Sequence, residues 1–579
     1  MWKRMAAVLI PVGTVALVVA ACGGGEATAT PAPTATTVAR PSPVATGTPS
    51  PATPAPSATP TSPAPTAAPT PTAPQPKTGG VLQARFYTDY RRWDTWRADA
   101  GFSYPFLRAM MSNLIQYQQG TFTIVGDLAE SWDVGPDGKS YTFRLRRDAQ
   151  WHDGMPVTSK DILYTFKRGQ DPQYTFNKTR VDPIQTMETP DDRTFKVTLK
   201  DFSNAFLPQA ATPFMLMYPA HVPDMAQWDK ARIGSGPFKL SADRPSASYE
   251  FVRNPAYFMK DPQGRSLPYL DGIVFNVIPD PALALSAFLT GRVQCSCTIS
   301  EFYVIQNEDR IRSQVPGVKM FSHLGAGNYL YFNTRRPPFD NLAFRQAIAI
   351  GVDKEKIGAT FALGKTLRPI PALVPSERGG QWALPQAELV RTPGFNPDHS
   401  ADLKIMRDKI QQSGVDPKKV KVQVLTSLSY QSLAEVIASH LASDLGLDTS
   451  VTVTQSTAEQ NKYLQAGDFS IYTMSDNGVI DDPGDWYRDW ITTGGAQNTG
   501  GYSNPRVDQI LAIQDKEPDF AKRKQLILEL QRIELTEFPK APLLWQLSIR
   551  AMWPEVMDFK VGPLNLQNWD WSSIWLDKR

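Results

Sequence analysis

The sequence has little of the chemistry that builds metal centres or disulfide frameworks. It contains three cysteines and five histidines in 579 residues. Besides Cys22, the cysteines are Cys295 and Cys297, which share one Gln-Cys-Ser-Cys segment without obvious partners, so we expect no disulfide framework. The histidines are scattered, and none are paired at the spacing of metal ligands. We therefore interpret the two thiols as structural and expect no metal site and no cofactor.

An excess of charge of one sign is also absent. The chain carries 60 basic and 57 acidic residues, for a formal net charge of +3, and no basic block interrupts it. A nucleic-acid partner is therefore not indicated. After Cys22 no apolar run is long enough to cross a bilayer.

Catalytic signatures are missing as well. The sequence contains no Gly-x-Ser-x-Gly elbow and no His-Glu-x-x-His helix. His152 and Asp153 precede Gly154 and are interpreted as a turn rather than as a catalytic pair. We expect a protein that is not an enzyme, with an extracytoplasmic hydrolase as the alternative.

The N-terminal 22 residues have the pattern of an export signal. A basic start is followed by about 15 apolar residues and then by Ala20-Ala21-Cys22. The run is shorter than the roughly 20 residues that a membrane span needs. Val19 to Cys22 resembles a bacterial lipoprotein box, which implies a signal peptide over 1–21 and lipid on Cys22. An ordinary signal peptide with a chance cysteine is the alternative, and both interpretations place the protein outside the cytoplasm.

A low-complexity segment follows over 22–78. Between Gly23 and Lys77 the only charges are Glu26, Arg40 and Lys77, and nearly all other residues are Pro, Ala, Thr, Ser or Gly. Such a segment cannot bury enough surface to offset its chain entropy. At roughly 3.1 Å per residue in a polyproline path it could reach on the order of 150 Å. We predict a disordered tether that holds the folded body away from the membrane.

The folded body is predicted to begin near Gly79 and to mix helices with strands. Alternating residues around the Gly135-Pro-Asp-Gly138 turn predict a hairpin over 131–147. Helical spacing and a Thr158 or Ser159 cap predict a helix over 159–168. Further helices are expected over 344–351, 430–447 and 521–537, and strands over 419–426 and 450–455. The fold class is therefore α/β or α+β with more than one sheet.

Four stretches together resemble one protein family. They are 127–161, which includes Leu-Ala-Glu-Ser-Trp and Trp-His-Asp-Gly; 234–272, from Gly-Ser-Gly-Pro-Phe-Lys to Leu-Pro-Tyr-Leu-Asp-Gly; 331–353, with Phe-Arg-Gln-Ala-Ile-Ala; and 538–545, Phe-Pro-Lys-Ala-Pro-Leu-Leu-Trp. In this order and spacing they resemble the family 5 solute-binding proteins of ABC importers, which bind dipeptides, oligopeptides and nickel. The resemblance covers roughly 79–579.

The resemblance implies an α/β, two-lobed fold like that of type II periplasmic binding proteins, with an extra subdomain in the first lobe. The expected bounds are 79–325 for the first lobe with its insertion at about 123–231, 326–545 for the second lobe, and 546–579 for the return. It further implies a monomeric receptor that closes around a solute and delivers it to an ABC importer permease. A sensor or adhesion module on the same fold is a further alternative.

The predicted ligand site centres on one acidic and aromatic loop. In peptide-binding members an aspartate in the corresponding loop pairs with the ligand's α-ammonium group, and here Asp476 and Asp481 are the candidates, walled by Trp486 and Tyr487. The alternative for each acid is that it caps the following helix and faces water; the Asp482-Pro483 pair is interpreted as that helix start. Expected cleft residues on the strand entering the second lobe are Tyr329, Tyr331 and Asn333, with core packing as an equal reading for the tyrosines.

The ligand class stays open at this level. The dipeptide branch has an arginine for the ligand's carboxylate before the helix at 430–447, but 424–431 contains no basic residue here. A short peptide clamped there by its carboxylate is therefore disfavoured, whereas a longer peptide needs no such clamp. Sugars, metal chelates and other solutes also remain candidates.

Overall fold

The first-lobe sheet has the strand order β1-β10-β9-β8. The computed structural model describes residues 74–87, 93–96, 104–173, 178–297, 301–364, 366–367, 373–378, 380–476, 478, 480–562 and 570–577. The four strands are β1 (Val81–Phe86), β8 (Phe238–Arg244), β9 (Ser248–Arg253) and β10 (Gly272–Val277). The pair β1 and β10 is parallel, and the other two pairs are antiparallel. The predicted signal peptide, Cys22 and all but the last residues of the predicted tether lie outside the described residues.

Helix α1 (Tyr104–Met110) buries six of its seven residues against this lobe. The ring of Phe106 lies 4.1 Å from that of Phe86 and 4.7 Å from that of Phe275, between centroids. The same hydrophobic core continues into the inserted subdomain.

That subdomain is an antiparallel sheet in the order β4-β5-β7-β6. Its strands are β4 (Ala129–Val134), β5 (Ser140–Leu145), β6 (Ile184–Asp191) and β7 (Thr194–Leu199). The helices of this region are α2 (Ser159–Gln170), α3 (Phe206–Ala210) and α4 (Met225–Ala231), and the hairpin β2 (Ile115–Tyr117)–β3 (Ile124–Gly126) precedes it.

Local sequence signals account for this subdomain well. The predicted hairpin is confirmed as β4 and β5, with Gly138 at a φ of 66° in its turn. The predicted helix is confirmed as α2, and the Thr158 amide donates to Asp161 Oδ2 (2.7 Å), as expected of a capping box. His152 and Asp153 do lie in a turn, closed by a bond from the Gly154 amide to the Trp151 carbonyl (2.9 Å).

The second lobe is built on a six-stranded sheet in the order β12-β16-β11-β15-β13-β14. The strands are β11 (Lys319–Phe332), β12 (Thr366–Leu367), β13 (Lys421–Ser427), β14 (Asp448–Thr454), β15 (Ile471–Asp476) and β16 (Lys540–Met552). Its helices are α8 (Leu342–Gly351), α9 (Lys354–Ala362), α10 (Gln386–Leu389), α11 (His399–Ser413), α12 (Gln431–Leu445), α13 (Thr457–Ala466), α14 (Pro483–Ile491), α15 (Pro505–Gln514) and α16 (Phe520–Glu537). The strands predicted at 419–426 and 450–455 and the helices predicted at 344–351, 430–447 and 521–537 are confirmed, and no end is shifted by more than two residues.

Two hydrophobic clusters cover the faces of this sheet. Side chains alternate between the faces along a strand, so Leu330 and Phe332 of β11 join one cluster while Tyr329 and Tyr331 join the other. The first cluster contains residues of α8 and α12, and the second contains residues of α14, α15 and α16. The core reading of the two tyrosines therefore fits their packing.

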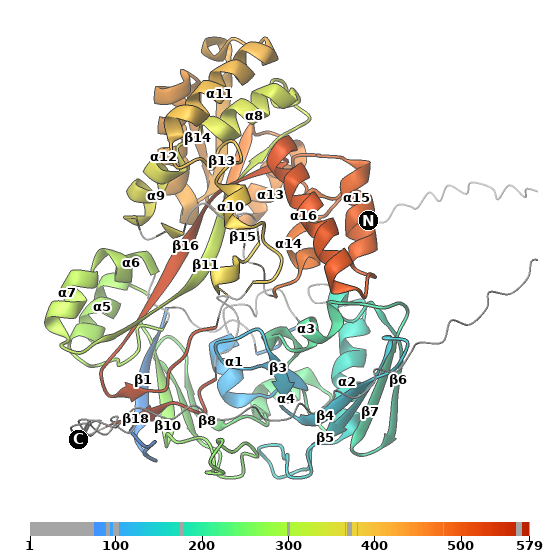
Figure 1. Ribbon diagram of the computed structural model, residues 1–579. Helices are drawn as coiled ribbons and strands as arrows, with labels where there is room; N and C mark the ends of the chain where they lie inside the picture. The colour runs from blue at the N-terminus through green and yellow to red at the C-terminus, as the bar shows by residue number, and fades with distance from the viewer. Residues whose placement is uncertain are drawn as a thin grey trace, which may run out of the picture. The chain divides into compact units, whose positions relative to one another are not determined.

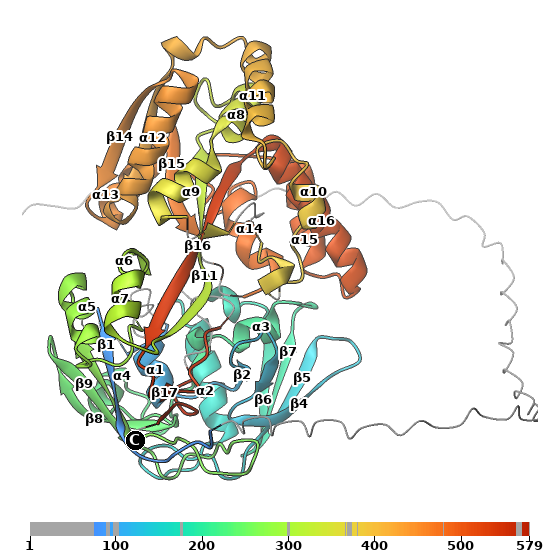
Figure 2. The same cartoon turned by 60° about the vertical axis from the view of Figure 1, so that its left-hand side comes forward.

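Two long strands connect the lobes. β11 has 14 residues and β16 has 13, and they pair antiparallel from Lys319–Met552 to Tyr331–Lys540. They run from the first-lobe elements into the second-lobe sheet (Figure 1, Figure 2). The expected lobe boundaries near 325 and 545 fall inside these strands, at an irregularity of the register between Leu324 and Gly327.

Around the first-lobe end of β16 lie the short helices α5 (Pro281–Leu289), α6 (Glu301–Gln306) and α7 (Glu308–Gln314), which share a hydrophobic cluster with Ile549 and Ala551. The strands β17 (Val556–Met557) and β18 (Trp575–Leu576) follow. Trp571 joins the first-lobe core, where its Nε1 donates to the Pro105 carbonyl (2.8 Å).

The two remaining cysteines pair with each other. Cys295 and Cys297 are both buried and form a disulfide with one residue, Ser296, between them; their Cα atoms are 5.0 Å apart. The sequence left these thiols without partners, and this is corrected here. This bond joins two cysteines that are separated only by Ser296, so it is a local link and not a disulfide framework.

Among the described residues, no helix has both the length and the apolar character that crossing a bilayer requires. Within the same residues, no three His, Cys, Asp or Glu side chains gather as they would around a metal ion.

Candidate functional site

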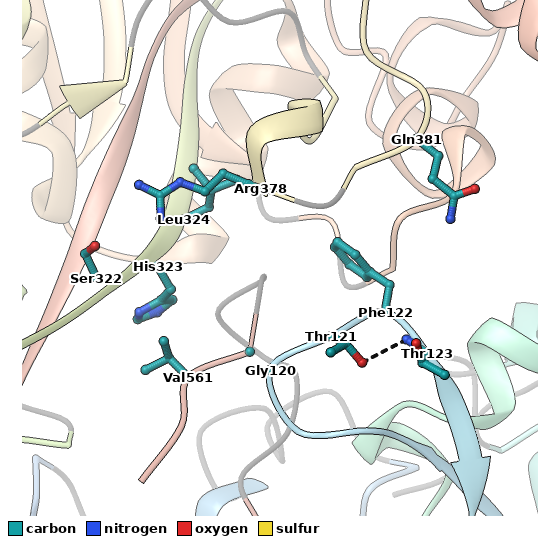
Figure 3. Close-up of a pocket in the computed structure, with 11 residues that line it drawn as sticks. Gly120, Thr121, Phe122, Thr123, Ser322, His323, Leu324, Arg378, Gln381 and Val561 are labelled. Atoms are coloured by element: carbon teal, nitrogen blue, oxygen red, sulfur yellow. Dashed lines mark hydrogen bonds between the residues drawn. The ribbon is translucent and has the colours of Figure 1, made fainter. Parts of the chain in front are cut away.

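A cavity of about 690 Å³ lies where the two connecting strands meet the first lobe (Figure 3). Its first-lobe wall is the β2–β3 turn, residues 120–123, together with Val561 and Gly562. Residues 322–324 of β11 also line it, and Arg378 and Gln381 line it from a second-lobe segment. The cavity is therefore bounded by both lobes and by a strand that connects them.

A second cavity of about 210 Å³ adjoins the first and shares Phe122 and Gln381 with it. Its remaining lining from the first lobe is Tyr117, Ile124, Asn204 and Pro208, and from the second lobe Trp382, Asp481, Asp482, Pro518, Phe520 and Arg523. The two volumes together fall in the range of small-molecule sites. Aromatic rings and a few polar groups line both cavities, as such sites require.

Asp481 is the exceptional group in this lining. Its Oδ2 accepts a hydrogen bond from the Gln381 amide (3.0 Å), while its Oδ1 is buried and has no partner among the described residues. Burial raises the pKa of Asp481 to about 7, and the neighbouring Asp482 adds to the rise. A buried carboxylate oxygen without a partner carries a desolvation cost, which a donor from a ligand can remove.

Asp482 has a different role. Its Oδ1 accepts from the Gly484 amide (2.9 Å), which makes it the N-cap of α14, and its Oδ2 pairs with Arg523 (2.6 Å). Both side chains of this ion pair are at least 95% buried. The structural interpretation of Asp482-Pro483 is confirmed, and it is Asp482, not Asp481, that caps the helix.

The segment bearing Trp382 supports the loop from the other side. Trp382 Nε1 donates to the Asp481 carbonyl (2.8 Å), and its ring lies 5.0 Å from that of Phe520. The guanidinium of Arg523 stacks over the Trp382 ring at 4.5 Å. The Asp481 loop is therefore positioned by contacts with two distant segments of the second lobe.

The other predicted site residues lie deeper. Trp486 and Tyr487 of α14 are fully buried; Trp486 Nε1 donates to the Ile480 carbonyl (2.9 Å), and Tyr487 Oη donates to Glu534 (2.7 Å). Tyr329 is also buried and lies beneath the ammonium group of Lys540, 4.4 Å from its ring centroid. None of these three is among the described residues that line the two cavities.

The remaining predicted site residues are Tyr331, Asn333 and Asp476. The Tyr331 ring packs against that of Trp490 at 5.0 Å. Asn333 Nδ2 donates to the carbonyls of Gly467 (3.0 Å) and Phe469 (3.1 Å). In this structure both residues hold strands and loops of the second lobe together. Asp476 ends β15 opposite Gly327, and its side chain lies outside the described part of the structure.

Comparison with known proteins supplies the family. The model of bacterial extracellular solute-binding proteins, family 5 (middle region), matches residues 123–498. The chain belongs to this family. This family 5 protein is 24% identical over 486 residues to di/tripeptide-binding protein 3 of Pseudomonas aeruginosa, covering 79% of this chain and 87% of the relative. It is also 24% identical over 492 residues to heme-binding protein A of Haemophilus influenzae, covering 78% and 84%.

Among solved structures, the family 5 protein resembles the periplasmic binding protein DppA of Helicobacter pylori, determined in complex with the peptide STSA. The TM-score is 0.68 at 22% identity, covering 87% of this chain and 99% of that one. The predicted two-lobed α/β fold is confirmed. The chain is thus a solute-binding protein by family and by fold.

The lobes of this solute-binding protein touch beside the smaller cavity. Asn204 Nδ2 donates to the Glu517 carbonyl (2.9 Å) and lies 3.3 Å from those of Gln514 and Asp515. Asp201 pairs with Lys516 (2.7 Å). These polar contacts hold the inserted subdomain against the second lobe.

Sequence reasoning missed most of the cavity lining. Phe122, Arg378, Gln381, Trp382 and Phe520 come from three separate segments, and no motif marks them. The available signal was weak: Phe520 and Trp382 are large apolar residues beside turn-forming segments. Only folding shows that these segments meet the Asp481 loop.

Proposed function

We propose that this protein binds a short peptide between its lobes and delivers it unchanged to an ABC importer. Membership of a family of extracellular solute-binding proteins supports a receptor, and relatives named as di/tripeptide-binding proteins support a peptide. The ligand's α-ammonium group would bind Asp481. Asp476, Trp486, Tyr487, Tyr329, Tyr331 and Asn333 stay proposed as contributors to this site, and the last five would act indirectly, by supporting the second-lobe segments that line it.

The observation that carries the proposal is that Asp481 Oδ1 has no hydrogen-bond partner among the described residues. This oxygen is buried at the wall of the interlobe cavity, and Oδ2 is already bonded to the Gln381 amide. An ammonium group there would satisfy the oxygen and form a charge-assisted hydrogen bond. The surrounding rings of Phe122, Trp382 and Phe520 would exclude water, which strengthens the attraction.

Delivery requires that the ligand favour the closed arrangement of the lobes. A ligand that binds open and closed forms equally cannot shift their ratio, however tightly it binds. A peptide seated between the β2–β3 turn and the Asp481 loop would touch both lobes at once. Binding would therefore stabilise the interlobe contacts at Asn204 and Asp201, and the permease would recognise that closed form.

We further propose that lipid on Cys22 anchors the receptor outside the cytoplasm and that residues 22–78 form its tether. The composition of the segment and the export pattern before it support this proposal. Mass spectrometry of the protein from a membrane fraction should show a lipidated Cys22 at its N-terminus. A Cys22→Ala variant should be found in the soluble fraction.

A ligand screen tests the central proposal. The full chain, purified in detergent, is heated with di-, tri- and tetrapeptide pools, with sugars, and with heme and other metal chelates. A tight ligand raises the melting temperature by mass action, and a ligand at 100 times its Kd adds about 2.7 kcal/mol. We expect the peptide pools to give the largest shift and the peptide to be recovered intact. A shift from sugars or chelates alone would refute the peptide assignment, and turnover of the peptide would refute the receptor assignment.

A further inference from the structure

Arg378 is a charged group in the large cavity that the proposed function has not used. It ends a short 3₁₀ helix, Ser376–Arg378, in the segment between β12 and α10, and it is half-buried. Its side chain lines the 690 Å³ cavity and extends toward β11, whereas Gln381 extends on the other side of Phe122 (Figure 3). Arg378 therefore occupies the end of the cavity away from Asp481.

Within the described residues the Arg378 guanidinium has no ion pair and no hydrogen bond. The other described residues of the large cavity include no Asp or Glu; they are Gly120, Thr121, Phe122, Thr123, Ser322, His323, Leu324, Gln381, Val561 and Gly562. Arg523, the arginine of the small cavity, is instead paired with Asp482 and bonded to Gln514. A guanidinium in a cavity whose described lining holds no counter-charge is placed to bind an anion.

The two adjoining cavities thus carry opposite charge at their far ends. Asp481 supplies a carboxylate oxygen in the small cavity and Arg378 supplies a cation in the large one, and neither group has a partner among the described residues. Phe122 and Gln381 line both, so one continuous ligand can pass between them. The hydroxyl group of Ser322 offers a further donor on the β11 side of the large cavity, toward which Arg378 extends (Figure 3).

The separation of these charges suits a short ligand. The Gln381 amide lies 3.0 Å from the Asp481 carboxylate, and Arg378 stands three residues before Gln381. The Cα atoms of residues 378 and 381 are therefore at most about 11 Å apart. The Arg378 side chain adds several ångströms to this distance, and an extended peptide rises about 3.3 Å per residue, so a peptide of only a few residues can connect the two groups.

We propose that Arg378 binds the free carboxylate of the ligand whose ammonium group binds Asp481. This inference rests on the proposed function and deepens it, because it restricts the ligand to a short peptide with both ends free. It also accounts for the absence of a basic residue over 424–431: the anion-binding group is supplied by a different segment of the second lobe.

Matched pairs of peptides test the inference without any mutation. Di-, tri- and tetra-alanine, each as the free acid and as the C-terminal amide, are titrated into the full chain by calorimetry. We expect the acid to bind about 10- to 100-fold more tightly than the amide, as for other charged hydrogen bonds between ligand and protein. Equal affinity for acid and amide would overturn the role of Arg378 while leaving the peptide receptor intact. If none of the alanine peptides binds, the role of Arg378 and the assignment of the protein as a receptor for short peptides are both rejected.

Variants then assign the preference to one side chain. Arg378→Met should reduce binding of the acid to the level of the amide and leave the amide unchanged, so the amide itself reports whether the variant is folded. Arg378→Lys keeps the charge and should retain part of the preference. Arg391→Met removes an exposed arginine that follows α10 and lines neither cavity among the described residues, and it should behave as the parent protein. An acid preference that survives Arg378→Met would refute the proposal.

Discussion

The substitution Asp481→Asn should stabilise the empty protein and weaken the binding of its ligand. Burial raises the pKa of Asp481 from a reference of 3.8 to about 7. A carboxyl group with a raised pKa holds its proton more tightly in the folded than in the unfolded chain, so ionisation opposes folding. The destabilisation of the folded protein by the ionised Asp481 begins as the pH rises above about 4. It grows until about pH 7 and is constant at higher pH.

The size of the effect follows from the shift. At 1.36 kcal/mol per pKa unit, the ionised Asp481 destabilises the folded protein by on the order of 4 kcal/mol above pH 7. Asparagine removes the charge and keeps an oxygen that can accept the Gln381 amide. For a body of about 500 residues, with an unfolding entropy of about 2.1 cal/mol/K per residue, the gain is on the order of 4 °C in Tm.

Thermal unfolding of the ligand-free protein at two pH values is the assay. Asp481→Asn should melt higher than the parent at pH 8, and the difference should vanish near pH 4, where the parent carboxyl is protonated in both states. Asp489→Asn changes an exposed acid on the following helix, α14; it is the control and should not change the Tm at either pH. A Tm difference that is the same at both pH values would refute the reasoning about burial.

Ligand binding supplies the second readout of the same variant. At pH 8 the loss of the carboxylate should weaken a peptide ligand by on the order of 100-fold, since truncating one side of a buried charged pair costs several kcal/mol. In the parent protein, affinity should fall by up to about tenfold per pH unit below pH 7, because a proton competes with the ammonium group for Asp481. Unchanged peptide affinity in Asp481→Asn would show that the ammonium group binds elsewhere.

Three further substitutions probe the frame of the site. Asn204→Ala removes the side-chain bonds to three second-lobe carbonyls and should weaken ligand binding, measured by calorimetry, about 3- to 10-fold. Unchanged ligand affinity would show that the lobes close without this contact. Arg523→Gln leaves Asp482 buried without its partner and should lower stability by about 3–5 kcal/mol in denaturant unfolding; a neutral result would contradict the buried pair. Gly138→Ala places a Cβ atom 2.7 Å from the Phe202 ring at a φ of 66°, and should lower the free energy of unfolding by at least about 1–2 kcal/mol in the same assay. A smaller loss would show that the turn relaxes.

Local signals explain why much of the secondary structure could be predicted. The hairpin β4–β5 depends on alternation and on a turn glycine at position 138, and α2 depends on the cap at Thr158. These preferences act over a few residues, so they are visible without the rest of the chain. The family resemblance added the two lobes, because its motifs are spaced along the whole body.

The site was predicted only in part, for a physical reason. An acidic loop beside aromatic residues pointed to Asp476 and Asp481 without deciding between them, and the Asp-Pro pair marked Asp482 as the start of a helix. That Asp481 Oδ1 has no partner among the described residues, while Asp482 pairs with Arg523, depends on residues far away in the sequence. Trp486 and Tyr487 were expected to wall the ligand, and the fold buries them behind the loop instead of in the described cavity lining. Which face of a helix meets a cavity is decided by packing against other helices.

The sequence by itself determined where helices and strands form, the balance of charge and the family to which the chain belongs. Those properties follow from short-range backbone preferences and from motifs that keep their order. Only the tertiary structure decided which carboxylate keeps an open oxygen and that Phe122, Arg378 and Gln381 border one cavity. The contacts of Asp481 with Gln381 and Trp382 join residues about 100 positions apart, and burial and hydrogen-bond partners at such separations exist only once the chain has folded.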